Sequence, residues 1–109
     1  MFGFKRKYVW KIFVPDYDNS GNKYSIEHHH QWDDKVRAIS GGLTIFKTAK
    51  GQWVNIEGKL YSEKVIPVEI YCTKKDISNI VDITIKHYTQ EAVYVHRSSN
   101  KAILRYAKK

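Results

Sequence analysis

The sequence predicts an α+β fold in which one antiparallel sheet carries two helices on a single face. Three observations support this prediction. Segments with the two-residue alternation of strands lie on both sides of two segments with helical periodicity. Glycine-containing turns divide the middle of the chain into a hairpin and a long strand. The chain has 109 residues, the size of one compact domain, so we expect residues 1–109 to form a single domain.

The first part of the chain predicts a strand followed by a helix. Tyr8–Val14 is rich in aromatic and β-branched residues, which favour a strand. After a polar loop, Ser25 is placed to cap a helix that reaches about Ser40, and Gly41-Gly42 would end it. The inward face of this helix should consist of residues that recur at helical spacing, namely His29, Trp32, Val36 and Ile39.

The middle of the chain predicts three further strands of the sheet. We expect strands at Leu43–Thr48, Trp53–Ile56 and Lys64–Thr73, with turns at Lys50-Gly51 and Gly58-Lys59. The core face of the last strand should carry Ile66, Val68, Ile70 and Cys72. Its other face should carry Val65, Pro67, Glu69 and Tyr71. Because proline has no N–H for the ladder, Pro67 predicts a locally unpaired or edge position.

The last third of the chain predicts a helix and two short strands. Asp76 is placed to cap a helix that reaches about Thr89. The apolar stripe of this helix should contain Ile77, Ile80, Val81, Thr84, Ile85 and Tyr88. We expect a strand at Ala92–His96 and a last short strand at Lys101–Tyr106.

This order of elements is typical of a ferredoxin-like βαββαβ fold with an inserted hairpin. In that arrangement one face of the sheet has no helices over it. Here it would carry Glu69 and Tyr71, with the large residues Tyr8 and Trp10 or their neighbours. A sheet face with so much aromatic area usually contacts a partner, and for a small protein the simplest partner is another copy of itself.

Composition sets further bounds on function. The net charge is +8 and the isoelectric point is about 9.6, which favours anionic partners, although a lysine-rich surface without any partner gives the same totals. The single cysteine, Cys72, excludes an internal disulfide, and its place in an apolar strand predicts a reduced, buried thiol in the cytoplasm. The sequence has no apolar run of the length that a membrane span needs, so we expect no membrane partner.

The segment from Trp53 to Glu63 is the strongest candidate for a ligand site. Trp53 and Tyr61 can stack on an adenine or another planar group, and Glu63 can accept a hydrogen bond from a ribose hydroxyl or an amine. Lys59 and Lys64 can contact phosphate. The alternative is that these aromatic residues pack on the sheet or in an interface between subunits.

Other patterns give weaker indications. Three consecutive histidines, His28 to His30, point about 100° apart on a helix and cannot all bind one ion, so we expect no metal and no cofactor. We include His29 among the candidate ligand-binding residues, with a structural role on the helix as the alternative. Cys72 has no activating base nearby in the sequence pattern. Nucleic acid is not the expected partner, because the aromatic motif of single-strand RNA binders is absent and Glu69 would repel phosphate.

Several segments resemble those of one known family. They are Gly51-Gln52-Trp53, Glu63-Lys64, Val68–Cys72 and Gln90–Val95, and they are similar to segments of the phage S-adenosylmethionine lyases. They also resemble small phage and bacterial proteins that share the pattern GG-T, G-x-W, E and QEAV. The resemblance implies a PII-like subunit with the ferredoxin-like fold that assembles as a trimer, with ligand sites between subunits.

The resemblance also implies roles for two residues. In the lyases, a tyrosine in the Gly-x-aromatic segment and a glutamate before the third strand serve the reaction, which expels methylthioadenosine and leaves homoserine lactone. Glu63 matches that glutamate, whereas Trp53 stands in the place of the tyrosine, and an indole can donate but not accept.

These indications favour one function over two alternatives. We expect an oligomeric binder of a nucleotide-like ligand that contains adenosine and is anionic, such as a phage counter-defence protein that sequesters a host signal. The first alternative is an S-adenosylmethionine lyase with Glu63 as the catalytic residue. The second is a basic nucleic-acid-binding or purely structural module.

Overall fold

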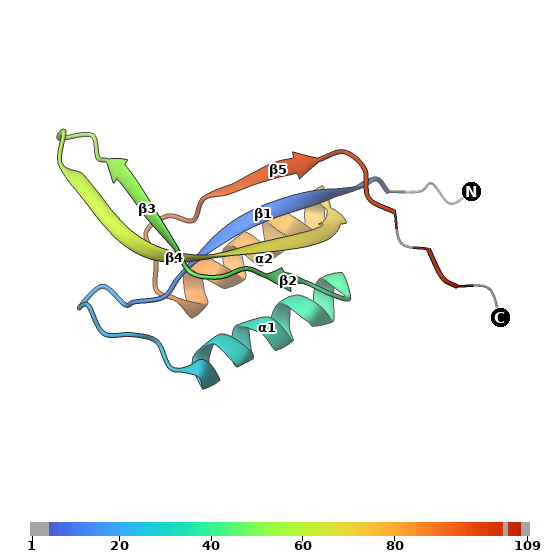
Figure 1. The fold of residues 1–109 in the computed structure, drawn as a ribbon, viewed down its shortest axis with the longest axis horizontal. Coiled ribbons are helices and arrows are strands. Elements are labelled where there is room, and N and C mark those ends of the chain that lie inside the picture. Colours follow the sequence, from blue (N-terminus) through green and yellow to red (C-terminus); the bar gives the residue numbers. More distant parts are fainter. Residues whose placement is uncertain (1–4, 104, 108–109) are drawn as a thin grey trace.

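The structure is a computed structural model that describes residues 5–103 and 105–107. It has the α+β architecture that the sequence predicts, with one antiparallel sheet of five strands and two helices (Figure 1). In chain order the elements are β1 (Lys7–Pro15), α1 (Ile26–Ser40), β2 (Thr44–Ile45), β3 (Ala49–Val54), β4 (Leu60–Thr73), α2 (Lys74–His87) and β5 (Val95–Ser99).

The long strand β4 organises the sheet. It pairs with β1 along one edge and with both β2 and β3 along the other, and β5 extends the sheet beyond β1. Only Val65–Thr73 of β4 pairs with β1, so the first part of β4 pairs with β3 alone. These two strands form a hairpin that projects away from the helices (Figure 1).

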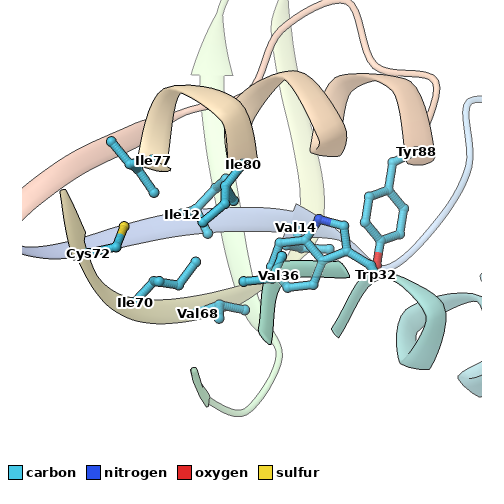
Figure 2. Packing of buried hydrophobic residues seen from close by; sticks show 10 residues of the cluster. All are labelled: Ile12, Val14, Trp32, Val36, Val68, Ile70, Cys72, Ile77, Ile80 and Tyr88. Carbon is cyan, nitrogen blue, oxygen red and sulfur yellow. The ribbon is translucent and has the colours of Figure 1, made fainter. Parts of the chain in front are cut away.

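The core lies between the sheet and the two helices (Figure 2). Alternate residues of β1 and β4 form its sheet side, and residues of α1 and α2 form the other side. The buried cluster consists of Ile12, Val14, Trp32, Val36, Val68, Ile70, Cys72, Ile77, Ile80 and Tyr88. Because its strand residues all belong to one face of the sheet, both helices cover that same face, as the sequence predicts.

The opposite side of the sheet, which we call the open face, carries the intervening residues. They include Lys11 and Phe13 of β1 and Val65, Glu69 and Tyr71 of β4. Tyr8 and Trp10 lie on the helix-covered side instead, where the Trp10 indole donates to the carbonyl of Cys72 at 3.0 Å. The expectation that Tyr8 and Trp10 lie on the uncovered face is therefore wrong, and the aromatic residues of the open face include Phe13 and Tyr71 instead.

Both helices begin at a side-chain cap. Ser25 caps α1 as predicted, accepting from the His28 N–H, and Gly41 ends the helix with φ 82°, a conformation that glycine adopts without strain. The cap of α2 is Thr73, whose hydroxyl accepts from the Asp76 N–H at 3.1 Å. The expectation that Asp76 is the cap is wrong, because Asp76 lies in the first turn, where its charge favours the helix dipole.

Several strand boundaries differ from those predicted. The segment 43–48 pairs only at Thr44–Ile45, and Lys50-Gly51 lies inside β3 rather than in a turn. Since α2 ends at His87, the chain needs residues 88–94 to cross from the helix layer to the sheet, so β5 begins at Val95 instead of Ala92. The last strand expected at 101–106 is absent from its described residues, and Leu104 lies outside them.

Pro67 occupies a gap in the ladder, as predicted. β2 pairs with β4 at Val68 and Glu69, and β3 pairs with it from Val65 towards the hairpin turn. Pro67 lies between these two stretches, and its carbonyl accepts from the Phe46 N–H at 2.9 Å. The N–H and C=O of one strand residue point to the same side, so the missing N–H of Pro67 faces the interruption between β2 and β3.

Candidate functional site

The candidate site is on the open face, where the β3–β4 hairpin joins the body of the sheet. Trp53 pairs with Tyr61, and Gly51 pairs with Glu63, so the side chains of Trp53, Tyr61 and Glu63 share one face of the hairpin. The Trp53 and Tyr61 rings stack with centroids 4.7 Å apart and an interplanar angle of 15°. Both rings are exposed, at 50% and 37%, so a planar ligand can reach them.

Lys59 adds a positive charge to this aromatic pair. Its ammonium group lies 5.2 Å from the centroid of Tyr61, within the range of a cation–π interaction. Tyr61 and Glu63 alternate along the same side of β4, and the Lys59 ammonium group lies over Tyr61, so a cation, an aromatic surface and a carboxylate follow one another along the hairpin.

Glu63 lines a small hollow on the open face. Its walls are Phe13, Pro15, Glu63, Val65, Gln90, Ala92, Val93 and Tyr94. The hollow has a volume of about 60 Å³. Pockets that enclose a small-molecule ligand measure roughly 300 Å³ or more. This hollow is therefore too small to enclose a nucleotide-sized ligand by itself.

An aromatic cluster borders the hollow. The rings of Phe13 and Tyr94 lie 5.6 Å apart, and the His96 ring is 6.0 Å from Phe13 and 5.6 Å from Tyr94. The His96 Nδ1 atom is buried and has no hydrogen-bond partner among the described residues. Further along the open face, Lys11 pairs with Glu69 at 3.8 Å.

Four of the predicted ligand-binding residues lie together, and two do not. Trp53, Tyr61 and Glu63 share the open face of the hairpin, and the Lys59 ammonium group lies over the Tyr61 ring. Lys64 alternates to the other face, where its ammonium group lies 6.0 Å from the centroid of Tyr17.

His29 is on α1, on the helix-covered side of the sheet. Its Nδ1 atom is 2.7 Å from the hydroxyl of Tyr88, and its Nε2 atom is 3.4 Å from a carboxylate oxygen of Asp16. The histidine is thus held by structural contacts at a distance from Glu63.

Sequence reasoning gave no role to three residues that border the hollow, namely Gln90, Tyr94 and His96. Gln90 and Tyr94 come from the crossing segment, which has no regular periodicity. The aromatic and histidine alternation of Tyr94 and His96 was the available signal, since residues two apart in an extended chain lie on the same side of it.

The Cys72 thiol is unsuited to nucleophilic chemistry. Burial raises the pKa of the Cys72 thiol to about 11, with a further contribution from Asp76, so the thiol is inert at neutral pH. Within residues 5–103 and 105–107, no group of three or more His, Cys, Asp or Glu side chains could hold a metal ion. Neither α1 nor α2, the two described helices, has the length and hydropathy of a membrane span.

Comparisons with known proteins identify the fold. No protein-family model matches the sequence, and no curated protein matches it either. The structure is similar to CutA1 from Oryza sativa, with a TM-score of 0.66 and 11% identity over 92% of this chain and 85% of that one. It is also similar to the divalent cation tolerance protein CutA1 from Thermus thermophilus, with a TM-score of 0.63 and 10% identity over 94% and 86% of the two chains.

A third similar structure is a phage S-adenosylmethionine lyase in complex with S-methyl-5'-thioadenosine. Its TM-score is 0.62, with 18% identity over 92% of this chain and 86% of that chain. At these identities the comparisons establish the fold that this chain shares with the CutA1 proteins and the phage lyase.

Proposed function

We propose that this protein is an oligomeric small-molecule-binding protein that holds its ligand between subunits, on the open face around Glu63. The observation that carries the proposal is the combination of a stacked, exposed Trp53–Tyr61 pair with the Glu63 carboxylate on the same face of one hairpin. Aromatic surface beside a single well-placed carboxylate is the usual composition of a small-molecule site.

Two features support an assembly of identical subunits, for which we favour a trimer. The hollow at Glu63 is too small to enclose a nucleotide by itself, so a neighbouring copy would complete it. The projecting hairpin also exposes the apolar side chains of Val54, Ile56 and Leu60. Exposed apolar groups on an extended arm are typical of contacts between subunits.

The ligand that fits best is nucleotide-like, with an adenine and an anionic group. The adenine would stack on the Trp53–Tyr61 pair, and Glu63 would accept from a ribose hydroxyl or from the amino group of the base. Lys59 beside this pair, together with the net charge of +8, favours a phosphate. A phage protein of this kind would act in the host cell by sequestering a nucleotide signal.

Calorimetric titration with adenine nucleotides and cyclic dinucleotides tests this function. We expect binding to the oligomer, and Glu63→Gln should weaken it about tenfold or more, because the ligand then donates to a neutral amide oxygen instead of a charged carboxylate. Glu69→Gln is the matched control, since Glu69 lies on the same face of the same strand but pairs with Lys11. Absence of heat with every nucleotide, for a correctly assembled oligomer, would count against the proposal.

The second candidate function is an S-adenosylmethionine lyase. It is favoured by the likeness in fold to the phage lyase and by the position of Glu63 at the hollow. Incubation with S-adenosylmethionine and detection of methylthioadenosine separate the two functions. Turnover that disappears in Glu63→Gln would establish the lyase and replace the binding function as the primary one.

A purely structural role is the remaining alternative. In that case Trp53 and Tyr61 would only join subunits, and Trp53→Ala would abolish assembly although no ligand is bound. Under the binding function, Trp53→Ala should weaken nucleotide binding more than it changes the oligomer. Stacking of a base on an aromatic side chain contributes about 1–3 kcal/mol to the free energy of binding.

A further inference from the structure

Two histidines that lie 59 residues apart in sequence form a reciprocal contact between the helices. The Nε2 atom of His28 in α1 is 2.9 Å from the carbonyl oxygen of His87 in α2. The Nε2 atom of His87 is in turn 2.7 Å from the carbonyl oxygen of His28. The two rings stack at 4.0 Å, and the ring of Tyr24 stacks on the other side of His28 at 4.8 Å. We call this pair the histidine clasp.

The geometry assigns the protonation state of His87. A carbonyl oxygen can only accept, so each Nε2 atom must carry a proton and donate it. The remaining nitrogen of His87, Nδ1, is 3.3 Å from the ammonium group of Lys35. An ammonium group can only donate, so Nδ1 must present its lone pair, and His87 is neutral in this arrangement.

The clasp also caps the C-terminal end of α2. The last carbonyls of a helix have no partner within it and need donors from outside. Here the carbonyl of His87 accepts from the His28 imidazole, and that of Tyr88 accepts from the hydroxyl of Tyr24 at 2.8 Å. The next residue, Thr89, has a positive φ of 51° and begins the segment that leads to the hollow.

The capped end continues directly into the wall of the Glu63 hollow. Gln90, which lines the hollow, donates from its side chain to the Tyr88 carbonyl at 3.0 Å and from its backbone to Ile85 at 3.0 Å. Tyr94, at the end of the same segment, lines the hollow as well and accepts from the Phe13 N–H. The position of residues 90–94 therefore depends on where α2 ends.

We propose that the histidine clasp is a pH-sensitive lock, closed when the His87 imidazole is neutral, that fixes residues 90–94 as the wall of the Glu63 hollow. The structural switch stands on the clasp itself, whereas its consequence for a ligand rests on the proposed function. Protonation of His87 would direct an N–H at the Lys35 ammonium group and would add a positive charge beside it. Both changes oppose closure of the clasp.

The charges around His87 set the direction of the response. Burial lowers the pKa of His87 below its ordinary value of 6.5, nearby cations lower it further, and the hydrogen bond to the His28 carbonyl opposes this shift. The titratable and charged groups that face His87 are His28, His29, Lys35, Lys86 and Tyr88. The carboxylate of Asp16 lies beside His29 instead.

The sign of the pH effect follows from linkage. Because the pKa is lower in the folded state, the folded protein binds fewer protons than the unfolded chain when the pH falls below 6.5. The stabilisation from the clasp is complete above that pH and is lost as the pH falls through and below it. Acid should therefore open the clasp and release residues 90–94.

Amide hydrogen exchange of the oligomer without ligand tests the lock. In the wild type, the protection factors of the Tyr88 and Gln90 amides, which donate to Thr84 and Ile85, should fall about tenfold between about pH 8 and about pH 5 after correction for intrinsic exchange. His87→Gln keeps a donor for the His28 carbonyl but cannot titrate, so its protection should change less than about twofold. His30→Gln, at an exposed position of α1, is the matched control and should behave as the wild type.

Two results would overturn the lock. One is wild-type protection of the Tyr88 and Gln90 amides that does not depend on pH, a result that needs no variant and holds even where His87→Gln fails to fold. The other is a pH response of His87→Gln equal to that of the wild type. Since no ligand is present in this experiment, its outcome is independent of whether the Glu63 hollow binds a nucleotide.

Discussion

The buried hydrogen bond between Trp32 and Thr84 joins the two helices, and its removal has a calculable cost. The Trp32 indole donates to the Thr84 hydroxyl at 2.9 Å, and the two residues are 1% and 0% exposed. Thr84→Val keeps the shape of the side chain but removes the acceptor, which leaves a buried N–H without a partner. We expect a loss of about 1–3 kcal/mol in the free energy of unfolding. For a protein of this size the melting temperature should fall by about 4–20 °C.

A double-mutant cycle isolates this hydrogen bond from other effects. Trp32→Phe removes the indole N–H, so Thr84→Val in the Trp32→Phe background should cost less than about 0.5 kcal/mol beyond the first change. Urea unfolding followed by circular dichroism gives all four stabilities without depending on tryptophan fluorescence. Protein concentration must be the same in each experiment, because assembly stabilises the folded state. An equal cost of Thr84→Val in both backgrounds would refute the reasoning.

Three further predictions concern single positions. A Cβ atom at Gly51 would lie 3.8 Å from Val65 and 3.9 Å from the Glu63 side chain, so Gly51→Ala should keep the stability of the protein. Gly51→Leu should cover Glu63 and weaken nucleotide binding, measured by calorimetry, about tenfold. Thr73→Ala should cost about 1 kcal/mol in urea unfolding, because α2 loses its cap. Cys72, with a pKa of about 11, should resist alkylation near neutral pH until the protein unfolds, and rapid native labelling would show that its strand is open.

The layers of the fold could be predicted from the sequence because they depend on local periodicity. Trp32 and Val36 recur at helical spacing, and Val68, Ile70 and Cys72 alternate, so the core of Figure 2 follows from these patterns. The short strand β2 could not be predicted at its true length. Its limits depend on the gap opposite Pro67, which only the register of β4 reveals.

The site was predictable in part for the same reason. Trp53, Tyr61 and Glu63 were recognised as suitable residue types, but only the register of the hairpin places them on one face and separates Lys64 from them. The histidine clasp was beyond sequence reasoning. It joins residues 59 positions apart through backbone carbonyls, and carbonyls carry no sequence signal.

The most direct test of the central claim is native mass spectrometry of the protein purified from cells. If copies of this chain close over the open face around Glu63, the spectrum should show an assembly of three chains, each of 12.8 kDa, that retains a nucleotide-like molecule. A monomer of 12.8 kDa at micromolar concentration, without any bound molecule, would contradict the account.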